Sequence, residues 1–405
     1  MGPRTDTKWR ALALVGVAEL FAMVLWFSGS AVAPELTAAW GLTPAETAWL
    51  TNAVQLGFVV GALGSALLTV ADVFRPRDLF AGSALVGAAA TALIAAAVHS
   101  ALPAILLRFV TGVALAGVYP TGMKMMAAWF DRGRGLAIGV LVGALTVGSA
   151  APHLLRAVGG IGRPRLVLYG AAAIAAVGGL LVLLYEPGPH QPEPAAFDPG
   201  AIRRIMTDRG VVLANLGYFG HMFELYAVWT WVPVYLLASL QASGSGSAET
   251  LAALLAFGTI AVGGPGAWLA GSAADRWGRS LVTSTSMVLS GAACLLAGLV
   301  YGAPVVVLAP FVLGWGVAVV ADSAQFSAAV SELAEGSYVG TALTLQTAVG
   351  FLVTIASIQL VPVLVEAVGW RWAFAPLVVG PLVGTLAMLK LRGRPEAARL
   401  AGGRG

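Results

Sequence analysis

The sequence predicts an all-α polytopic membrane protein with twelve transmembrane helices, arranged as two pseudo-symmetric six-helix bundles. Hydrophobic residues make up 59% of the 405 residues, and charged residues only 10%. A helix needs about 20 apolar residues to cross the bilayer core, and twelve apolar runs suited to this follow one another. In lipid the backbone must satisfy its own hydrogen bonds, and a barrel would show weaker, alternating segments, so we expect helices.

Charged residues, prolines and glycines separate the runs and place the spans. In order, the spans are expected near residues 11–33, 47–71, 78–98, 102–126, 135–156, 166–185, 211–238, 249–273, 280–301, 304–328, 338–364 and 371–390. The first run resembles a signal peptide, but it is too long, Glu19 interrupts it, and Pro34 follows the cleavage-like sequence. We therefore expect it to be the first span.

A polar stretch divides the spans into two sets of six. Residues 186–209 begin with a Pro-rich sequence that cannot form a continuous helix. They end in a short basic segment that is expected to lie on the inner membrane surface. We expect an N-terminal bundle of residues 1–187, a cytoplasmic linker of residues 188–209 and a C-terminal bundle of residues 210–405.

The basic residues indicate the orientation of the chain. In a twelve-span arrangement most of them fall on the side of the two chain ends. The exceptions on the opposite side are Arg156, Arg163, Arg165 and Arg371. Positively charged loops stay inside, so both termini are expected in the cytoplasm of a multi-pass protein of the inner or plasma membrane. The net charge of +4 follows this topology and does not indicate nucleic-acid binding.

No cofactor or metal site is expected. The single cysteine, Cys294, lies inside a span, which excludes a disulfide or a cysteine-based metal site within one chain. We interpret it as a small apolar core residue. The four histidines are scattered, and the chain has no His-Glu-x-x-His, no Gly-x-Ser-x-Gly and no phosphate-binding glycine loop. These absences argue against a membrane enzyme.

The two halves of the chain repeat one another. Residues 19–26, Glu-Leu-Phe-Ala-Met-Val-Leu-Trp, align without gaps with residues 224–231, Glu-Leu-Tyr-Ala-Val-Trp-Thr-Trp. The loop at residues 271–279 follows the pattern Gly-x-x-x-Asp-Arg-x-Gly-Arg, and a partial copy lies 203 residues earlier. The partial copy keeps its acidic residue and two basic residues, which are Asp72, Arg75 and Arg77. This is an internal duplication.

The loop pattern resembles the signature loop of the major facilitator superfamily. The five matching positions are Gly271, Asp275, Arg276, Gly278 and Arg279. The resemblance covers essentially the whole chain, and it implies two parallel six-helix repeats that alternate access to a substrate site between them. It also implies that the two loops act as gates.

In such a gate, the loop carboxylate meets the start of a helix in the opposite half, where exposed amides and the helix dipole attract it. By analogy, Asp275 is expected near residues 133–135 and Asp72 near residues 337–339. The Asp72 loop lacks the adjacent arginine, so the gate at Asp275 is expected to be the stronger of the two.

Ionisable side chains inside spans cost on the order of 2.5–3.5 kcal/mol each on insertion scales, so each one needs a reason. By helical spacing, Glu19 shares a face with Trp26, and Glu224 shares one with Trp231 and His221. One interpretation is a structural carboxylate bonded to a neighbouring helix. The other is a proton carrier in a central cavity, with Glu224 as the first candidate and His221 as its relay.

Spans 4 and 10 carry the remaining candidates for the cavity. Arg108 stands four residues before a glycine, and this resembles the superfamily's span-4 motif, which implies a part in proton transfer. Tyr119 lies further along that helix, and Lys124 near its end is either a cavity residue or a snorkelling anchor. In span 10 the candidates are Asp322 and Gln325, whereas Glu332 is expected to be solvated.

The expected function is secondary active transport of a small solute, such as a small organic acid or another metabolite, coupled to protons. A drug or metabolite efflux antiporter of the same superfamily is the alternative, and a channel or a polytopic enzyme is a remote one. The expected partners are the solute, protons and the lipid bilayer, and the expected state is a monomer. The sequence does not identify the substrate or the direction of transport.

Overall fold

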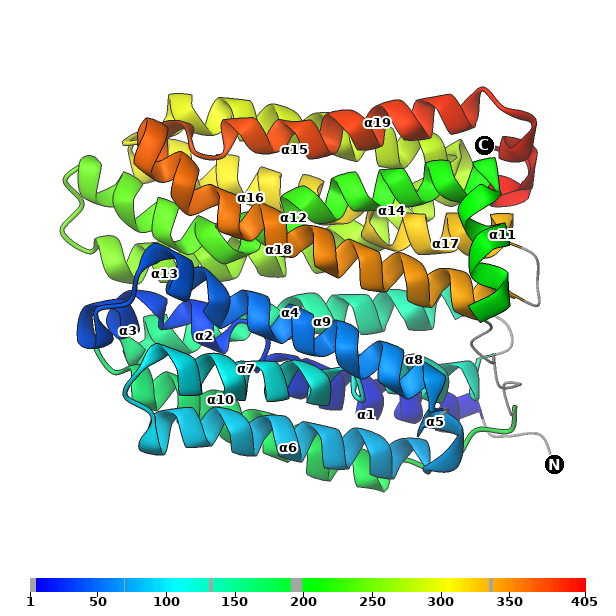
Figure 1. Ribbon diagram of the computed structural model, residues 1–405, viewed down its shortest axis with the longest axis horizontal. Coiled ribbons are helices and arrows are strands. Elements are labelled where there is room, and N and C mark those ends of the chain that lie inside the picture. Colours follow the sequence, from blue (N-terminus) through cyan, green and yellow to red (C-terminus); the bar gives the residue numbers. More distant parts are fainter. Residues whose placement is uncertain (1–4, 69, 131–133, 191–198, 335–337) are drawn as a thin grey trace. The chain divides into compact units, whose positions relative to one another are not determined.

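The computed structural model describes residues 5–68, 70–130, 134–190, 199–334 and 338–405. These residues form helices and no strand, and Figure 1 shows long helices running side by side within each half. Eleven helical segments of the described chain are long and apolar enough to cross a membrane. The prediction of an all-α polytopic membrane protein is therefore confirmed.

The chain forms two compact units, residues 1–194 and residues 195–405. The boundary between them in the sequence falls within the predicted linker. The first unit consists of α1 (Thr5–Met23), α2 (Ser28–Ala31), α3 (Ala33–Trp40), α4 (Pro44–Leu67), α5 (Val70–Val73), α6 (Pro76–Ala97), α7 (Ala101–Leu115), α8 (Tyr119–Ala127), α9 (Arg134–Leu155) and α10 (Pro164–Leu181). The second consists of α11 (Ile202–Thr207), α12 (Arg209–Ala242), α13 (Ala248–Ala261), α14 (Gly263–Trp277), α15 (Arg279–Val300), α16 (Val305–Ala321), α17 (Ser323–Leu333), α18 (Val339–Trp372), α19 (Val379–Arg392) and the 3₁₀ segment η6 (Pro395–Gly402).

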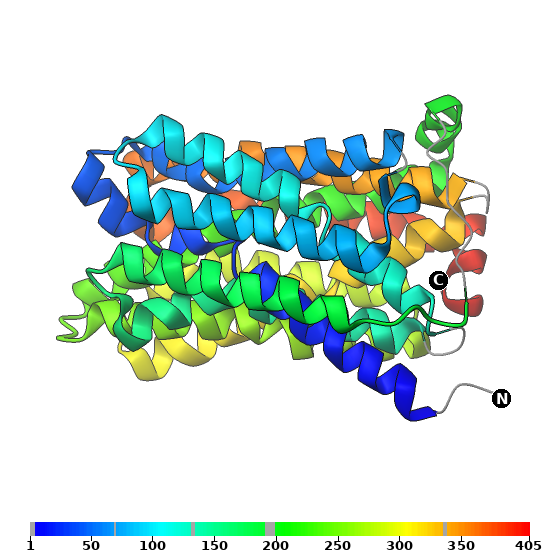
Figure 2. The ribbon, with the colours of Figure 1, turned by 90° about the horizontal axis from the view of Figure 1, so that it is seen from below.

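The helices of each unit enclose their own core. In the first unit α4 packs on α7, α6 on α7 and α10, and α1 on α9 and α10; Figure 2 shows α1 running obliquely beside α10. In the second unit α12 packs on α13, α18 and α19, and α15 packs on α16 and α19.

The first predicted span is not one continuous helix. Residues 24–27 form a turn between α1 and α2, and α2 and α3 are separated again at Val32. The expectation of an unbroken helix over residues 11–33 is therefore wrong, and the site below gives the physical reason. Three other spans are interrupted more briefly: α7 from α8 at residues 116–118, α13 from α14 at Val262, and α16 from α17 at Asp322.

Several glycines stand where the backbones of two helices approach each other closely. A Cβ at Gly57 of α4 would overlap the carbonyl oxygen of Phe109, and one at Gly112 of α7 would overlap that of Val54. The second unit repeats the contact, since a Cβ at Gly316 of α16 would overlap the Thr259 carbonyl of α13. Helices in lipid gain little from apolar burial, so such small-residue contacts carry much of their association.

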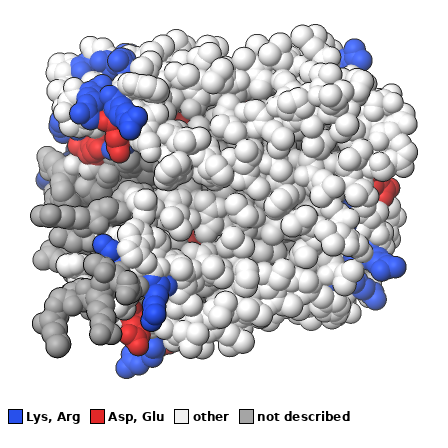
Figure 3. Space-filling model, turned by 180° about the vertical axis from the view of Figure 1, so that it is seen from behind, with Lys and Arg blue, Asp and Glu red and all other residues white. Residues whose placement is uncertain are grey.

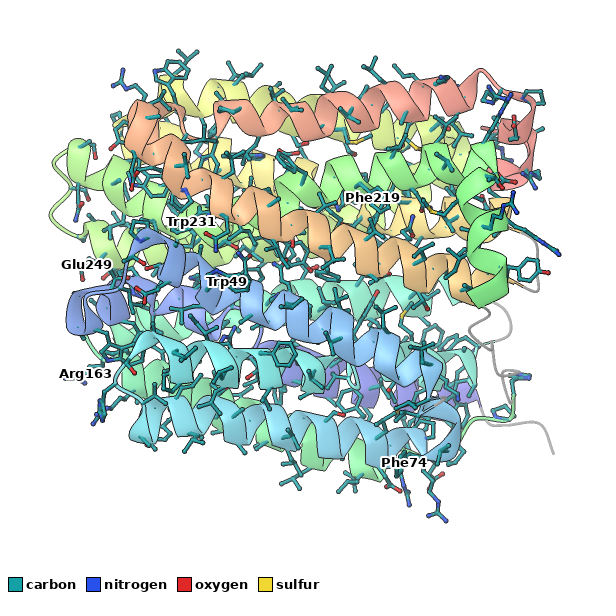
Figure 4. The ribbon with its side chains drawn as sticks, viewed as in Figure 1. Trp49, Phe74, Arg163, Phe219, Trp231 and Glu249 are labelled. Carbon is teal, nitrogen blue, oxygen red and sulfur yellow. The ribbon has the colours of Figure 1, made fainter. Side chains whose placement is uncertain are left out.

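The surfaces of the helices match a lipid environment. In Figure 3 the Lys, Arg, Asp and Glu side chains gather at the two ends of the helices, and the broad surface between them is almost free of charge. Figure 4 places Arg163 at one end of the first unit and Phe74 at the other. Exposed side chains in the middle of the helices are large and apolar, such as Val86, Val288 and Leu386.

The segment just before the predicted linker is tied to the rest of the first unit. The Tyr185 hydroxyl donates a 2.9 Å hydrogen bond to the Met125 carbonyl, and Trp129 donates one of 3.1 Å to the Glu186 carbonyl. Arg77 also donates to the Tyr185 carbonyl at 3.4 Å. Burial raises the pKa of Tyr185 to about 12, so its hydroxyl stays a donor at neutral pH.

Candidate functional site

Arg108 of α7 closes the break in the first span. Its Nη1 donates to the Leu25 carbonyl at 2.8 Å and to the Ser28 hydroxyl at 3.0 Å, and its Nη2 donates to the Trp26 carbonyl. Its Nε donates to the Leu50 carbonyl of α4 at 3.0 Å. A guanidinium offers five donors, so four of the five serve backbone or hydroxyl groups around the break.

This arrangement explains why the first span bends where it does. The turn at residues 24–27 frees carbonyls that a continuous helix would satisfy, and in a membrane protein such groups need a partner. Gly29 makes room for that partner, because its Cβ would lie 3.0 Å from Nε of Arg108. These contacts make Arg108 a structural brace of the first span.

Glu19 of α1 is buried without any polar partner among the described residues. The side chain has no exposed surface, and neither carboxyl oxygen has a hydrogen-bond partner there. It lies against α8, where a Cβ at Gly122 would be 2.6 Å from its Oε2. A buried ionised carboxylate without a partner is very costly, so this site accommodates the neutral, protonated acid.

The other candidates of the first unit lie in the turn after α1 and in α8. Trp26 stands in the turn, with its ring 5.2 Å from that of Phe58. Tyr119 begins α8 and is partly buried, as is Lys124 in the last turn of the same helix.

Glu224 of α12 has a different environment from its sequence counterpart. Its Oε2 accepts a hydrogen bond of 2.8 Å from the Ser290 hydroxyl. Its Oε1 accepts 3.1 Å and 3.2 Å bonds from the Cys294 thiol and the Trp315 indole N–H. Three donors from α15 and α16 therefore converge on one buried carboxyl group. Hydrogen bonds of this kind stabilise the ionised form of a carboxyl group.

His221 does not join this cluster. Its Nδ1 lies 2.9 Å from Oδ1 of Asp322, and its Nε2 lies 2.7 Å from the Ser323 hydroxyl. The Asp322 contact has the distance of an ion pair, but this oxygen makes no aligned hydrogen bond. Among the described residues no hydrogen bond joins Glu224 and His221: the two side chains leave α12 toward different helices, and His221 lies at the break between α16 and α17. The relay expected between them stays a prediction.

Trp231 lies further along α12 than Phe219 and belongs to an aromatic cluster (Figure 4). Its indole N–H donates to the Ile358 carbonyl of α18 at 2.9 Å, and its ring lies 6.1 Å from that of Trp370. These contacts give it a packing role within the second unit.

The signature loop is the turn between α14 and α15. Gly278 ends α14 with φ +94°, a conformation that favours glycine. Asp275 and Arg276 are exposed, and Gly271 of α14 approaches Gln325, whose Nε2 would lie 3.7 Å from an added Cβ.

Arg279 of this loop bonds to α17. It makes a bidentate pair with Glu332, with N···O distances of 2.8 Å and 2.6 Å. It also donates to Oε1 of Gln325 at 2.8 Å and lies 3.8 Å from Asp275. The expectation that Glu332 is solvated is therefore wrong, because an arginine from another helix reaches it.

The partial copy of the loop is less completely described. Arg75 is the residue before α6, and Arg77 lies 3.5 Å from Asp78 and near Tyr185. The side chain of Asp72, residues 131–133 and residues 335–337 lie outside the described part of the chain. The two expected helix starts near residues 133–135 and 337–339 thus fall largely there.

Sequence reasoning missed the donors around Glu224. Ser290 and Cys294 are four residues apart in an apolar span, so they share one helix face, and this spacing was a usable indication. Glu332 and Gln325 are seven residues apart and likewise share a face, which indicates a common partner. Nothing in the sequence pointed to the turn after Met23.

Two helical units with membrane-length helices and buried polar braces define a polytopic membrane protein of the duplicated, carrier-like kind. A family model described as Major Facilitator Superfamily matches residues 15–270 and residues 214–405. The chain belongs to this superfamily, and the resemblance of its signature loop is thereby confirmed. It is a transporter of that family.

Individual relatives are more distant. Over 124 residues the chain is 32% identical to the niacin transporter NiaP of Acinetobacter baylyi, and the alignment spans 28% of this chain and 28% of that protein. The chain therefore matches only about a quarter of the length of this curated relative.

Solved structures show the same fold at low identity. A bacterial homologue of the human lysosomal transporter Spinster, in an inward-facing and occupied conformation, has a TM-score of 0.74 and 14% identity, covering 97% of this chain and 100% of that one. The nucleoside transporter NupG has a TM-score of 0.72 and 14% identity, covering 95% and 99%. At such identities the likeness concerns the fold.

Proposed function

We propose that the protein is a proton-coupled secondary transporter of a small organic acid or a similar small metabolite. The observation that carries the proposal is the pair of buried acids in equivalent positions of the two halves. Glu19 has no described partner, whereas Glu224 has three donors. Glu19 is suited to be neutral in this conformation and to release its proton where water or a cation reaches it.

Glu224, in contrast, is suited to remain an anion that holds α15 and α16 on α12. We therefore assign the coupling proton to Glu19 and a bracing role to Glu224, which reverses the ranking suggested by the neighbouring His221. In the alternative function, in which the solute is exported in exchange for protons, Glu19 would carry the coupling proton as well. The name of the partial relative makes nicotinate a sensible first probe.

Uptake into proteoliposomes tests this function. With nicotinate and a panel of small organic acids, we expect a solute flux that saturates, and we expect a protonophore to abolish its accumulation against a gradient. Empty liposomes are the control. Accumulation insensitive to the protonophore would exclude proton coupling, and a flux that never saturates would favour a channel.

We also propose that the protein lies in the inner or plasma membrane with both termini in the cytoplasm. The distribution of Lys and Arg supports this orientation. Single cysteines at Glu249 and Ser272, both exposed, test it on a background with Cys294 replaced by Ser. An impermeant thiol reagent added to intact cells should label the cysteine at Glu249 and spare the one at Ser272. The reverse pattern would overturn the orientation.

A further inference from the structure

The last described residues of the chain pack against the signature loop. The amide of Ser280, at the start of α15, donates a 3.2 Å hydrogen bond to the Gly405 carbonyl. The Arg404 guanidinium donates to the Asp275 carbonyl. The side chain of Leu400 is completely buried, although it belongs to the short segment η6 beyond the last long helix.

Gly278 of the signature loop allows this close contact because it has no side chain. A Cβ at Gly278 would overlap the carbonyl oxygens of both Arg404 and Gly405. Its positive φ already favours glycine, so the position meets two requirements at once: a tight turn and the close approach of the tail backbone.

The Glu332 carboxylate accepts hydrogen bonds both from the C-terminal segment, residues 394–405, which we call the tail, and from the signature loop. Its Oε2 accepts the Ala401 amide at 3.0 Å and the Nε of Arg279 at 2.8 Å, while its Oε1 accepts Nη2 of Arg279 at 2.6 Å. Hydrogen bonds to charged groups are about twice as strong as neutral ones. The tail amide therefore adds a donor to the carboxylate that anchors α17 to the α14–α15 turn.

We propose that residues 394–405 form an intramolecular latch on the signature loop. When docked, the latch keeps Arg279 on Glu332 and holds α17 in place. When released, it allows α17 to swing at the break at Asp322, where His221 contacts Asp322 and Ser323. The consequence for transport rests on the proposed function: the docked latch slows the transport cycle, and its release speeds it.

Amide hydrogen exchange tests the docking without any transport assay. In a chain ending at Gly393, we expect exchange in residues 275–282 and 328–333 to rise about threefold or more, because local opening governs exchange. Leu400→Asp tests the same contact in the full chain if the truncation does not fold. Arg404→Ala should give part of the rise, and the matched control Arg399→Ala, whose guanidinium lies 4.0 Å from Asp208, should give none.

Initial rates of nicotinate uptake give the second readout. A higher rate in the truncated chain, Leu400→Asp and Arg404→Ala, with an unchanged rate in Arg399→Ala, supports the latch. Unchanged exchange in the loop, exchange that rises equally in all helices, or altered exchange with unaltered rates would overturn it. Absence of uptake by the unmodified protein would instead count against the proposed function, and the exchange result would still decide whether the tail is docked.

Discussion

Replacing Arg108 by Met is expected to destabilise the protein by about 3 kcal/mol or more, the largest effect of any single substitution proposed. The change removes the guanidinium's hydrogen bonds to the carbonyls of Leu25, Trp26 and Leu50. Each hydrogen bond to a charged group contributes about 1.5–3 kcal/mol, against a total stability of about 5–15 kcal/mol for a typical domain.

Thermal unfolding of the purified protein in detergent measures this effect. Arg163→Met is the matched control, because Arg163 is exposed at one end of the first unit, and its melting temperature should stay within a degree or two of the unmodified protein. Arg108→Lys should recover only part of the loss, since an ammonium cannot reproduce the planar fork of donors. If Arg108→Met melts like the control, Arg108 does not brace the first span.

The substitutions Glu19→Gln and Glu224→Gln are expected to impair different properties, the first proton coupling and the second stability. Glu19→Gln should abolish accumulation driven by a pH gradient while leaving counterflow exchange and thermal stability largely intact, because a neutral amide imitates the protonated acid. Glu224→Gln should lower stability by about 1–3 kcal/mol, since it removes the negative charge that strengthens the bonds from Ser290, Cys294 and Trp315 and replaces one acceptor oxygen by a donor.

Both variants are measured in the same two assays, so each is the control of the other. Glu224→Asp keeps the charge but shortens the side chain, and it should lie between Glu224→Gln and the unmodified protein in stability. The assignment fails if Glu19→Gln still accumulates solute on a pH gradient. It also fails if Glu224→Gln loses only the coupled mode while its stability is unchanged, because Glu224 would then be the proton carrier.

The sequence by itself determined the membrane class, the order of the spans, the duplication and the superfamily, whereas eleven of the twelve expected spans are helices of membrane length in the described chain. These properties rest on hydropathy and on local repeats, which need no knowledge of neighbours. The predicted span boundaries agree with the helices to within a few residues, except at the first span and between the last two, where α18 continues to Trp372 and α19 begins at Val379.

Only the tertiary structure decided which partner each buried polar group meets. His221 and Glu224 are three residues apart and look like neighbours on one face, yet they contact α17 and α15–α16 respectively. The turn after Met23 is invisible in the sequence because the groups that stabilise it come from Arg108, more than 80 residues away. Helical periodicity gives the direction in which a side chain points away from the axis of its helix. The neighbouring helix that the side chain contacts depends on how the whole bundle packs.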